Sequence, residues 1–310
     1  MKKTGGNFDP KDKHIYFLAS NHSTLKHVVD QAKYMLIAVN ELKSQSALDH
    51  LEKFLDKGIK VFLDSGVYSV AMEHAKKNNL SHNEALRVPL HELEKFPWLY
   101  DLYCQIVERF GDRLWGYIEI DLGGKEQKRE TRKGLEQKGL RPIPVYHPLN
   151  DGWDYFDELA EQYDRIAVGN IVYASSAMRL RIMSMIWQRK QSYPHLWTHL
   201  LGFHLHEHLN AYPAESVDSS SWLAAIRWGR QAESAMLSGI GLLPRSLLYK
   251  MGEEGSYQKG EKLWAYAIAM NQKNWRNHIK AATEAGLYPS ECMPPPGLKC
   301  TTRGELPPKQ

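Results

Sequence analysis

Polar side chains able to do acid–base or nucleophilic chemistry follow several apolar segments of this 310-residue chain. Asp64 stands in "DSGVYS", Asp121 in "EIDLGG", His147 in "VYHP" and Asp218 in "SVDSSSW", while "AVGN" closes another segment. Several carboxylates without an evident metal site suit chemistry at a glycosidic carbon, where one attacks as nucleophile and another moves a proton. Small serines around Asp218 would leave room for a sugar and keep the carboxylate ionised.

Eight apolar runs rich in β-branched residues predict the strands that would position these groups. The segments between them have helical spacing, as in 47–58 and 150–164, so the chain alternates strand and helix. Alternation of this kind predicts a parallel sheet, and eight strands favour a TIM-type (β/α)8 barrel over a doubly wound open sheet. The predicted strands are 15–19, 34–39, 60–64, 115–121, 142–146, 165–169, 198–203 and 215–218.

The positions of the polar residues at the strand ends favour a shared site. In a parallel barrel the carboxyl ends of the strands build the active site, so the three aspartates and His147 would converge on one mouth. Each also has a structural explanation, because Asp commonly caps helices or forms turns after strands. If these residues served only as helix caps, we would expect varied residue types at these positions. The recurrence of Asp therefore favours a shared functional site.

The composition fits one barrel with additions. We predict a flexible N-terminus over 1–13, the barrel over 14–238 with a helical insertion at 70–114 after the third strand, a helical C-terminal extension over 239–291 and a Pro-rich tail over 292–310. No apolar run reaches 18 residues, which argues against a membrane span. The net charge of +4 does not demand nucleic acid, and we interpret the basic runs 123–141 and 178–190 as solvated helix faces.

Four of these motifs together resemble a known family. "DSGVYS", "EIDLGG", "AVGN" and "HLLGF…YPAESVDSSSW" stand in the order and spacing of the tRNA-guanine transglycosylase superfamily. Within it, the chain is most similar to the phage and bacterial branch that places 7-deazaguanines in DNA. The resemblance runs from about residue 14 to 235, and the last motif, with Arg227 and Gly229 after it, is its most specific part.

The resemblance implies a role for each matching residue. Asp218 would be the nucleophile that displaces guanine, Asp64 the general acid/base, Asp121 the reader of the 2-amino edge, and Tyr68 the ring that stacks on the base. The full set that it implies for base binding is Ser65, Gly66, Tyr68, Asp121, His147, Gly169, Asn170 and Gly202, and for nucleic-acid binding Ser219, Ser220, Trp222 and Arg227.

The implied activity is a glycosyltransferase (pentosyltransferase) reaction without a cofactor. Guanine in DNA would be replaced by a free 7-deazaguanine, a preQ0-like base, through a covalent Asp-glycosyl intermediate. tRNA is the alternative substrate. The family's zinc-binding cysteines and histidine are missing, and Cys292 and Cys300 are weak candidates for a structural zinc site. The three widely spaced cysteines predict a reducing compartment, the cytoplasm, which would be the host's if the protein is phage-encoded.

The chain departs from the family pattern at several positions. Val67 replaces a small residue, Tyr68 replaces a commoner Phe, and Asn170 replaces a Gly. In another register Glu215 would become the nucleophile, but the serines and Trp222 align only with Asp218.

Two other functions stay open from the sequence. A metal-dependent hydrolase would use the histidines His199, His204, His206 and His208. A nucleic-acid-binding barrel without catalysis would not need two buried carboxylates.

Overall fold

Eight parallel strands form a single sheet in the computed structural model, which describes residues 1–12, 15–26, 29–30, 32–203, 212 and 214–220. Their order is β4-β3-β2-β1-β8-β7-β6-β5, so the first and the last strand of the chain lie side by side. The strands are β1 (Ile15–Ala19), β2 (Tyr34–Ala38), β3 (Lys60–Asp64), β4 (Gly116–Tyr117), β5 (Val145–Tyr146), β6 (Arg165–Val168), β7 (Trp197–Leu200) and β8 (Ser216–Ser219).

The ring of strands closes between β4 and β5 through one parallel bridge, which pairs Ile118 with Ile143. The backbone N–H of Ile143 donates to the carbonyl of Tyr117 at 2.8 Å, and the N–H of Glu119 donates to the carbonyl of Ile143 at 3.0 Å. The Glu119 carboxylate continues this join by accepting from the N–H of Val145 at 2.6 Å. These contacts complete the TIM-type barrel that the sequence predicts.

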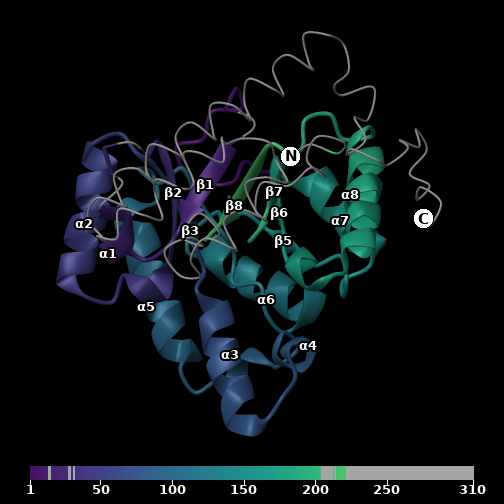
Figure 1. The fold of residues 1–310 in the computed structure, drawn as a ribbon, viewed down its shortest axis with the longest axis horizontal. Helices are drawn as coiled ribbons and strands as arrows, with labels where there is room; N and C mark the ends of the chain where they lie inside the picture. Colours follow the sequence, from purple (N-terminus) through teal and green to yellow (C-terminus); the bar gives the residue numbers. More distant parts are fainter. Residues whose placement is uncertain (13–14, 27–28, 31, 204–211, 213, 221–310) are drawn as a thin grey trace, which may run out of the picture.

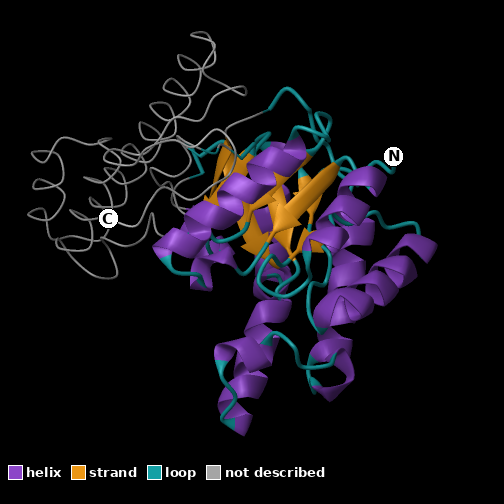
Figure 2. Ribbon diagram, turned by 90° about the vertical axis from the view of Figure 1, so that its right-hand side faces the viewer, coloured by secondary structure: helices purple, strands orange, loops and turns teal. Residues whose placement is uncertain are grey.

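Helices surround the strands on the outside of the barrel (Figures 1 and 2). The insertion after β3 contains α3, α4 and α5, of which α3 and α4 project away from the barrel, so the predicted helical insertion is confirmed. The helices are α1 (His22–Leu25), α2 (Gln45–Asp56), α3 (Val67–Asn78), α4 (His82–Ala85), α5 (Phe96–Phe110), α6 (Gly124–Gln137), α7 (Trp153–Gln162) and α8 (Ser176–Lys190), with 3₁₀ turns at Val39–Glu41, Leu90–Glu92 and Ile171–Tyr173.

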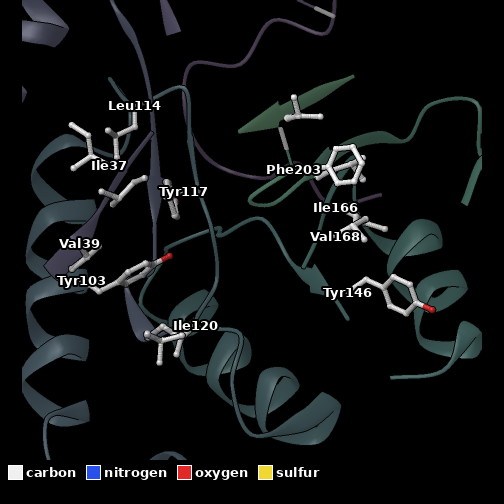
Figure 3. Close-up of a cluster of buried hydrophobic side chains, with 14 of the residues drawn as sticks. Ile37, Val39, Tyr103, Leu114, Tyr117, Ile120, Tyr146, Ile166, Val168 and Phe203 are labelled. Carbon is white, nitrogen blue, oxygen red and sulfur yellow. The ribbon is translucent and has the colours of Figure 1, made fainter. Parts of the chain in front are cut away.

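Both faces of the strands are buried, which explains their unbroken apolar sequences. In β1, Ile15 and Phe17 pack inside the barrel with Trp115, while the alternate residues Tyr16 and Leu18 pack against the helices. The cluster between strands and helices is the larger of the two, and Figure 3 shows part of it, with Tyr103, Ile166 and Phe203 among the labelled side chains.

The first residues of the chain are not the flexible N-terminus that the sequence predicts. The backbone N–H of Gly5 donates to the carbonyl of Arg141 at 2.6 Å, and that of Asn7 donates to Leu114 at 2.6 Å. The buried Arg165 guanidinium donates to the Gly5 carbonyl and lies over the Phe8 ring at 4.3 Å. A cation inside a barrel needs such partners, so this segment is held at the end where the strands begin.

The basic run on α6 is only in part the solvated face that we expected. Lys128 and Arg132 are buried, where they pair with Asp151 at 2.5 Å and with Glu119 at 2.6 Å. In α8, Arg189 pairs with Asp157 and Lys190 with Glu215. Many of these charges therefore hold helices to the barrel.

None of the helices in the described part of the chain is long and apolar enough to cross a membrane. The predicted helical extension over 239–291 and the Pro-rich tail over 292–310 lie outside the described residues.

Candidate active site

A cavity of about 390 Å³ opens at the carboxyl ends of the strands, and its volume falls in the range of small-molecule sites. The segments that follow β3, β4, β5, β6 and β7, together with β8, all contribute to its wall. The lining residues are Leu36, Asp64, Val67, Tyr68, Leu86, Asp121, Leu122, His147, Gly169, Asn170, Val172, Tyr173, Leu201, Gly202, Asp218 and Ser220. The three aspartates that the sequence singled out therefore share one cavity.

Asp218 lies on β8 with its side chain almost fully buried and one oxygen firmly held. Its Oδ1 accepts from the backbone N–H of Gly202 at 2.8 Å and lies 3.0 Å from Nε2 of His199. The Nδ1 atom of His199 is 2.5 Å from the hydroxyl oxygen of Ser216, which precedes Asp218 by two residues on the same strand. Within the described residues, Oδ2 has no hydrogen-bond partner, so one carboxylate oxygen is fixed and the other faces the cavity unengaged.

Asp64 ends β3 and occupies a setting that favours its protonated form. Burial, together with the negative charges of Asp121 and Asp218, raises the pKa of its carboxyl to about 7. Hydrogen bonds from the backbone of Gly66 and Ser65 oppose this rise. Gly66 has a φ of +73°, and a Cβ there would lie 2.6 Å from Oδ1 of Asn40, so the turn that presents Asp64 requires glycine.

Asp121 follows β4 and is held ionised by a neighbour from the adjoining strand. Burial opposes its ionisation, but the hydrogen bond and the charge of His147, together with the charge of Lys128, lower the pKa of the carboxyl. Nε2 of His147 lies 3.0 Å from Oδ2 of Asp121, and the Ser65 hydroxyl donates to Oδ1 at 3.4 Å. Two carboxyls in one cavity therefore have their pKa values pushed apart, so they suit different roles.

The backbone of His147 is held by a buried ion pair. Its backbone N–H donates to Oδ2 of Asp151 at 2.7 Å, and Nζ of Lys128 donates to the same oxygen at 2.5 Å. On the cavity side, a Cβ on Gly169 would lie 2.7 Å from Nε2 of His147. The glycine therefore provides the space that the imidazole occupies.

Two tyrosines stand at the exposed edge of the cavity. The hydroxyl of Tyr173 donates to that of Tyr68 at 2.7 Å, and their ring planes are inclined by 23° with centroids 6.5 Å apart. Tyr68 is the second residue of α3 and Tyr173 lies in the 3₁₀ turn after β6, so the pair joins two separate parts of the cavity wall. Flat exposed rings in such a place suit the stacking of a planar heterocycle.

Most of the residues implied by the resemblance meet at this cavity. Asp64, Tyr68, Asp121, His147, Gly169, Asn170, Gly202, Asp218 and Ser220 line it, while Ser65 and Gly66 hold Asp121 and Asp64 from the adjoining loop. Ser219 is buried, and its carbonyl accepts from the Tyr16 hydroxyl at 3.2 Å. Trp222 and Arg227 lie outside the described residues, as do Cys292 and Cys300.

Glu215, the alternative nucleophile in another register, has a structural role. Its Oε2 accepts from Nζ of Lys190 at 2.5 Å and from the N–H and hydroxyl of Thr198 at 2.8 and 2.7 Å. It precedes β8 and does not line the cavity, so the geometry favours Asp218 over Glu215.

Three residues that contribute to the site were not predicted in their observed roles from the sequence. His199 entered only as a metal candidate, yet it contacts Asp218; a lone histidine in an apolar strand was the available signal. Tyr173 and Asp151 were not considered, although each lies within four residues of a motif that was. Within the described residues no group of three or more His, Cys, Asp or Glu is placed to hold a metal ion, and His204, His206 and His208 lie outside them.

The chain was compared with protein families, curated proteins and solved structures. No protein-family model and no curated protein matches the chain. Among solved structures, it is similar to the carboxyl transferase domain from Rhizobium etli pyruvate carboxylase with 3-bromopyruvate, with a TM-score of 0.39 and 10% sequence identity. The match covers 89% of this chain and 47% of that chain, so the chain spans about half of that protein's length.

Proposed function

We propose that this barrel exchanges bases on a nucleic acid, replacing guanine with a free 7-deazaguanine through a covalent bond to Asp218. The observation that carries the proposal is that Asp218, Asp64 and Asp121 line one cavity in three different hydrogen-bonding and electrostatic settings. The resemblance to guanine transglycosylases rests on the same residues. Together they favour a transferase over a metal-dependent hydrolase.

In the first step Oδ2 of Asp218 would attack C1′ of the sugar as the bond from C1′ to N9 of guanine breaks. The anionic carboxylate stabilises the positive charge that develops on the sugar in the transition state. The electron pair of the broken bond goes to the departing guanine, and the carboxyl of Asp64 supplies its proton. A group with a pKa of about 7 is well matched to this task at neutral pH.

In the second step N9 of the incoming base would attack C1′ and lose its proton to Asp64, while the ester bond to Asp218 breaks. The proton balance of the whole exchange is then zero, and Asp64 ends protonated as it began. Asp121 would accept hydrogen bonds from the N–H and NH₂ edge of either base, which its ionised state favours. Tyr68 would stack on the ring at the cavity edge.

We propose DNA as the nucleic acid and tRNA as the alternative, because the zinc-binding cysteines of the tRNA enzymes are missing from the sequence. The target nucleotide would have to leave the helical stack to reach a cavity of this kind. We place the enzyme in the cytoplasm, in keeping with its sparse, widely spaced cysteines.

The test is to incubate the protein with DNA or tRNA labelled in guanine plus a free 7-deazaguanine and to measure the released label. We expect release from DNA, and an adduct of protein and DNA that survives denaturation when the free base is omitted. The Asp218→Asn variant should lose both, with exchange falling about 10³-fold or more. The exposed Asp30→Asn, whose carboxylate pairs with Lys57 and which belongs to none of the motifs, is the matched control.

Release from tRNA alone would reverse the choice of substrate. Exchange that persists unchanged in Asp218→Asn would contradict the proposed nucleophile, and no release from either nucleic acid would contradict the proposed activity.

A further inference from the structure

The strongest unassigned feature of the cavity is a buried histidine behind the proposed nucleophile. His199 lies on β7, with no exposed surface, and β7 pairs with β8 in a register that sets His199 opposite Ser216. Its ring meets the edges or faces of Phe62 and Phe17 at centroid distances of 4.8 and 5.8 Å. A polar ring in this aromatic setting requires partners for both nitrogens.

Both nitrogens have such partners, and these contacts assign the nitrogen that donates to Asp218. An ionised Asp218 can only accept, so the Nε2 atom, 3.0 Å from Oδ1, must carry a hydrogen. The Ser216 hydroxyl lies 2.5 Å from Nδ1, and a hydroxyl can pair with that nitrogen as donor or as acceptor. Ser216 and Asp218 face the same side of β8 because they are two residues apart, so one strand supplies both partners of the imidazole.

We propose that His199 is the positioning residue of the nucleophile. Together with the Gly202 N–H, it holds Oδ1 of Asp218 and thereby assigns Oδ2 as the attacking oxygen. Its Nε2–H stays bonded to the carboxylate while the glycosyl ester forms, and it stabilises the carboxylate again when the ester breaks. This assignment rests on the proposed function, because it takes Asp218 as the group that attacks the sugar.

The activity test uses three variants in the full chain. His199→Leu removes the donor and should lower kcat for exchange about 100-fold, the effect of a misplaced reacting group, with KM for the free base within about twofold. His199→Gln keeps an N–H near the position of Nε2 and should recover at least about tenfold of that loss. Ser216→Ala should lower kcat by a smaller factor, since the ring keeps its bond to Asp218. Exchange by a folded His199→Leu within about threefold of the original rate would overturn the proposal.

A second measurement decides the inference without any turnover. Nitrogen-15 NMR of the imidazole groups of the full chain should show His199 protonated at Nε2, and Asp218→Asn should shift that signal. A single proton on Nδ1 would overturn the inference even if exchange is observed. If the original protein exchanges no base at all, the proposed function fails, while the NMR signal still decides whether His199 holds Asp218. If His199→Leu does not fold, His199→Gln and Ser216→Ala carry the kinetic test.

Discussion

Nε2 of His147 lies 3.0 Å from Oδ2 of Asp121, and this contact joins the segments that follow β5 and β4 across the place where the barrel closes. The contact lowers the pKa of Asp121 against the effect of burial. The residue proposed to read the base is therefore kept ionised by a neighbour whose own position depends on Asp151 and Gly169.

Asp121→Asn should weaken recognition of the free base more than it slows chemistry. The substitution removes a charge-assisted acceptor, which is worth roughly 1.5–3 kcal/mol, so KM for the 7-deazaguanine should rise about 10- to 100-fold. A concentration series of the free base at saturating DNA measures the effect. The exposed Asp30→Asn should leave KM unchanged, and an unchanged KM in Asp121→Asn would remove this residue from the proposed base-reading group.

Gly169→Ala should disturb the same recognition without removing any polar group. Its Cβ would stand 2.7 Å from Nε2 of His147, so the imidazole must move away from Asp121. We expect KM for the free base to rise about tenfold, as lost charge-assisted hydrogen bonding predicts. Gly134→Ala on α6 is the control, because a Cβ there would meet only the Tyr100 hydroxyl at 3.9 Å and should leave exchange as it is.

The raised pKa of Asp64 predicts how stability depends on pH. Its folded pKa of about 7 exceeds that of an unfolded Asp, so its contribution to stability is fully present below about pH 4 and is lost as the pH rises to 7. Asp64→Asn should therefore stabilise the protein relative to the original at pH 8 by roughly 2–4 kcal/mol, and not at pH 4. Denaturant unfolding at the two pH values measures this difference, and an equal effect at both would contradict the raised pKa.

The titration of the Asp64 carboxyl should also make the rate of base exchange depend on pH. Because protonated Asp64 would donate to the departing guanine, we expect kcat to fall as the pH rises above about 7. A rate that stays level from pH 6 to 9, with chemistry limiting, would argue against Asp64 as the acid.

Lys128→Met should destabilise the fold strongly, because it leaves Asp151 buried without its cation. Removing one partner of a buried pair typically costs about 3–5 kcal/mol. The double variant Lys128→Met, Asp151→Asn should regain part of this loss. Lys125→Met, which breaks the exposed pair with Asp154, should cost less than about 1 kcal/mol. Urea unfolding of the four proteins checks the ranking, and equal costs for both lysines would show that burial does not govern them.

The strands were predictable because both of their faces are buried, which makes each one a short apolar run between turn residues. The site was predictable as far as its aspartates follow those runs at one end of the barrel. His199 was not, because in a strand buried on both sides the sequence does not show which residues face inward. The role of the first residues was not predictable either. This segment is polar and contains glycines, and its place at the end of the barrel where the strands begin depends on its contact with the buried Arg165, which is distant in the sequence.

The buried charges of α6 also could not be predicted from the sequence. A basic run is expected on the solvated surface when no buried carboxylates pair with it. Here Lys128 and Arg132 pair with Asp151 and Glu119, which lie outside the run in the sequence. Such pairings depend on the three-dimensional arrangement of segments that no local pattern reveals.

The join between β4 and β5 has a mechanical consequence. Every other pair of neighbouring strands around the ring is joined by two or more paired residues. Between β4 and β5, the join consists of one bridge and the hydrogen bond that the Glu119 carboxylate accepts from Val145. We therefore expect the barrel wall to yield most readily at this join, directly below Asp121 and His147. A bulky base entering there would part these two strands more readily than it would displace β8, which carries Asp218 and pairs with β1 at four residues and with β7 at two.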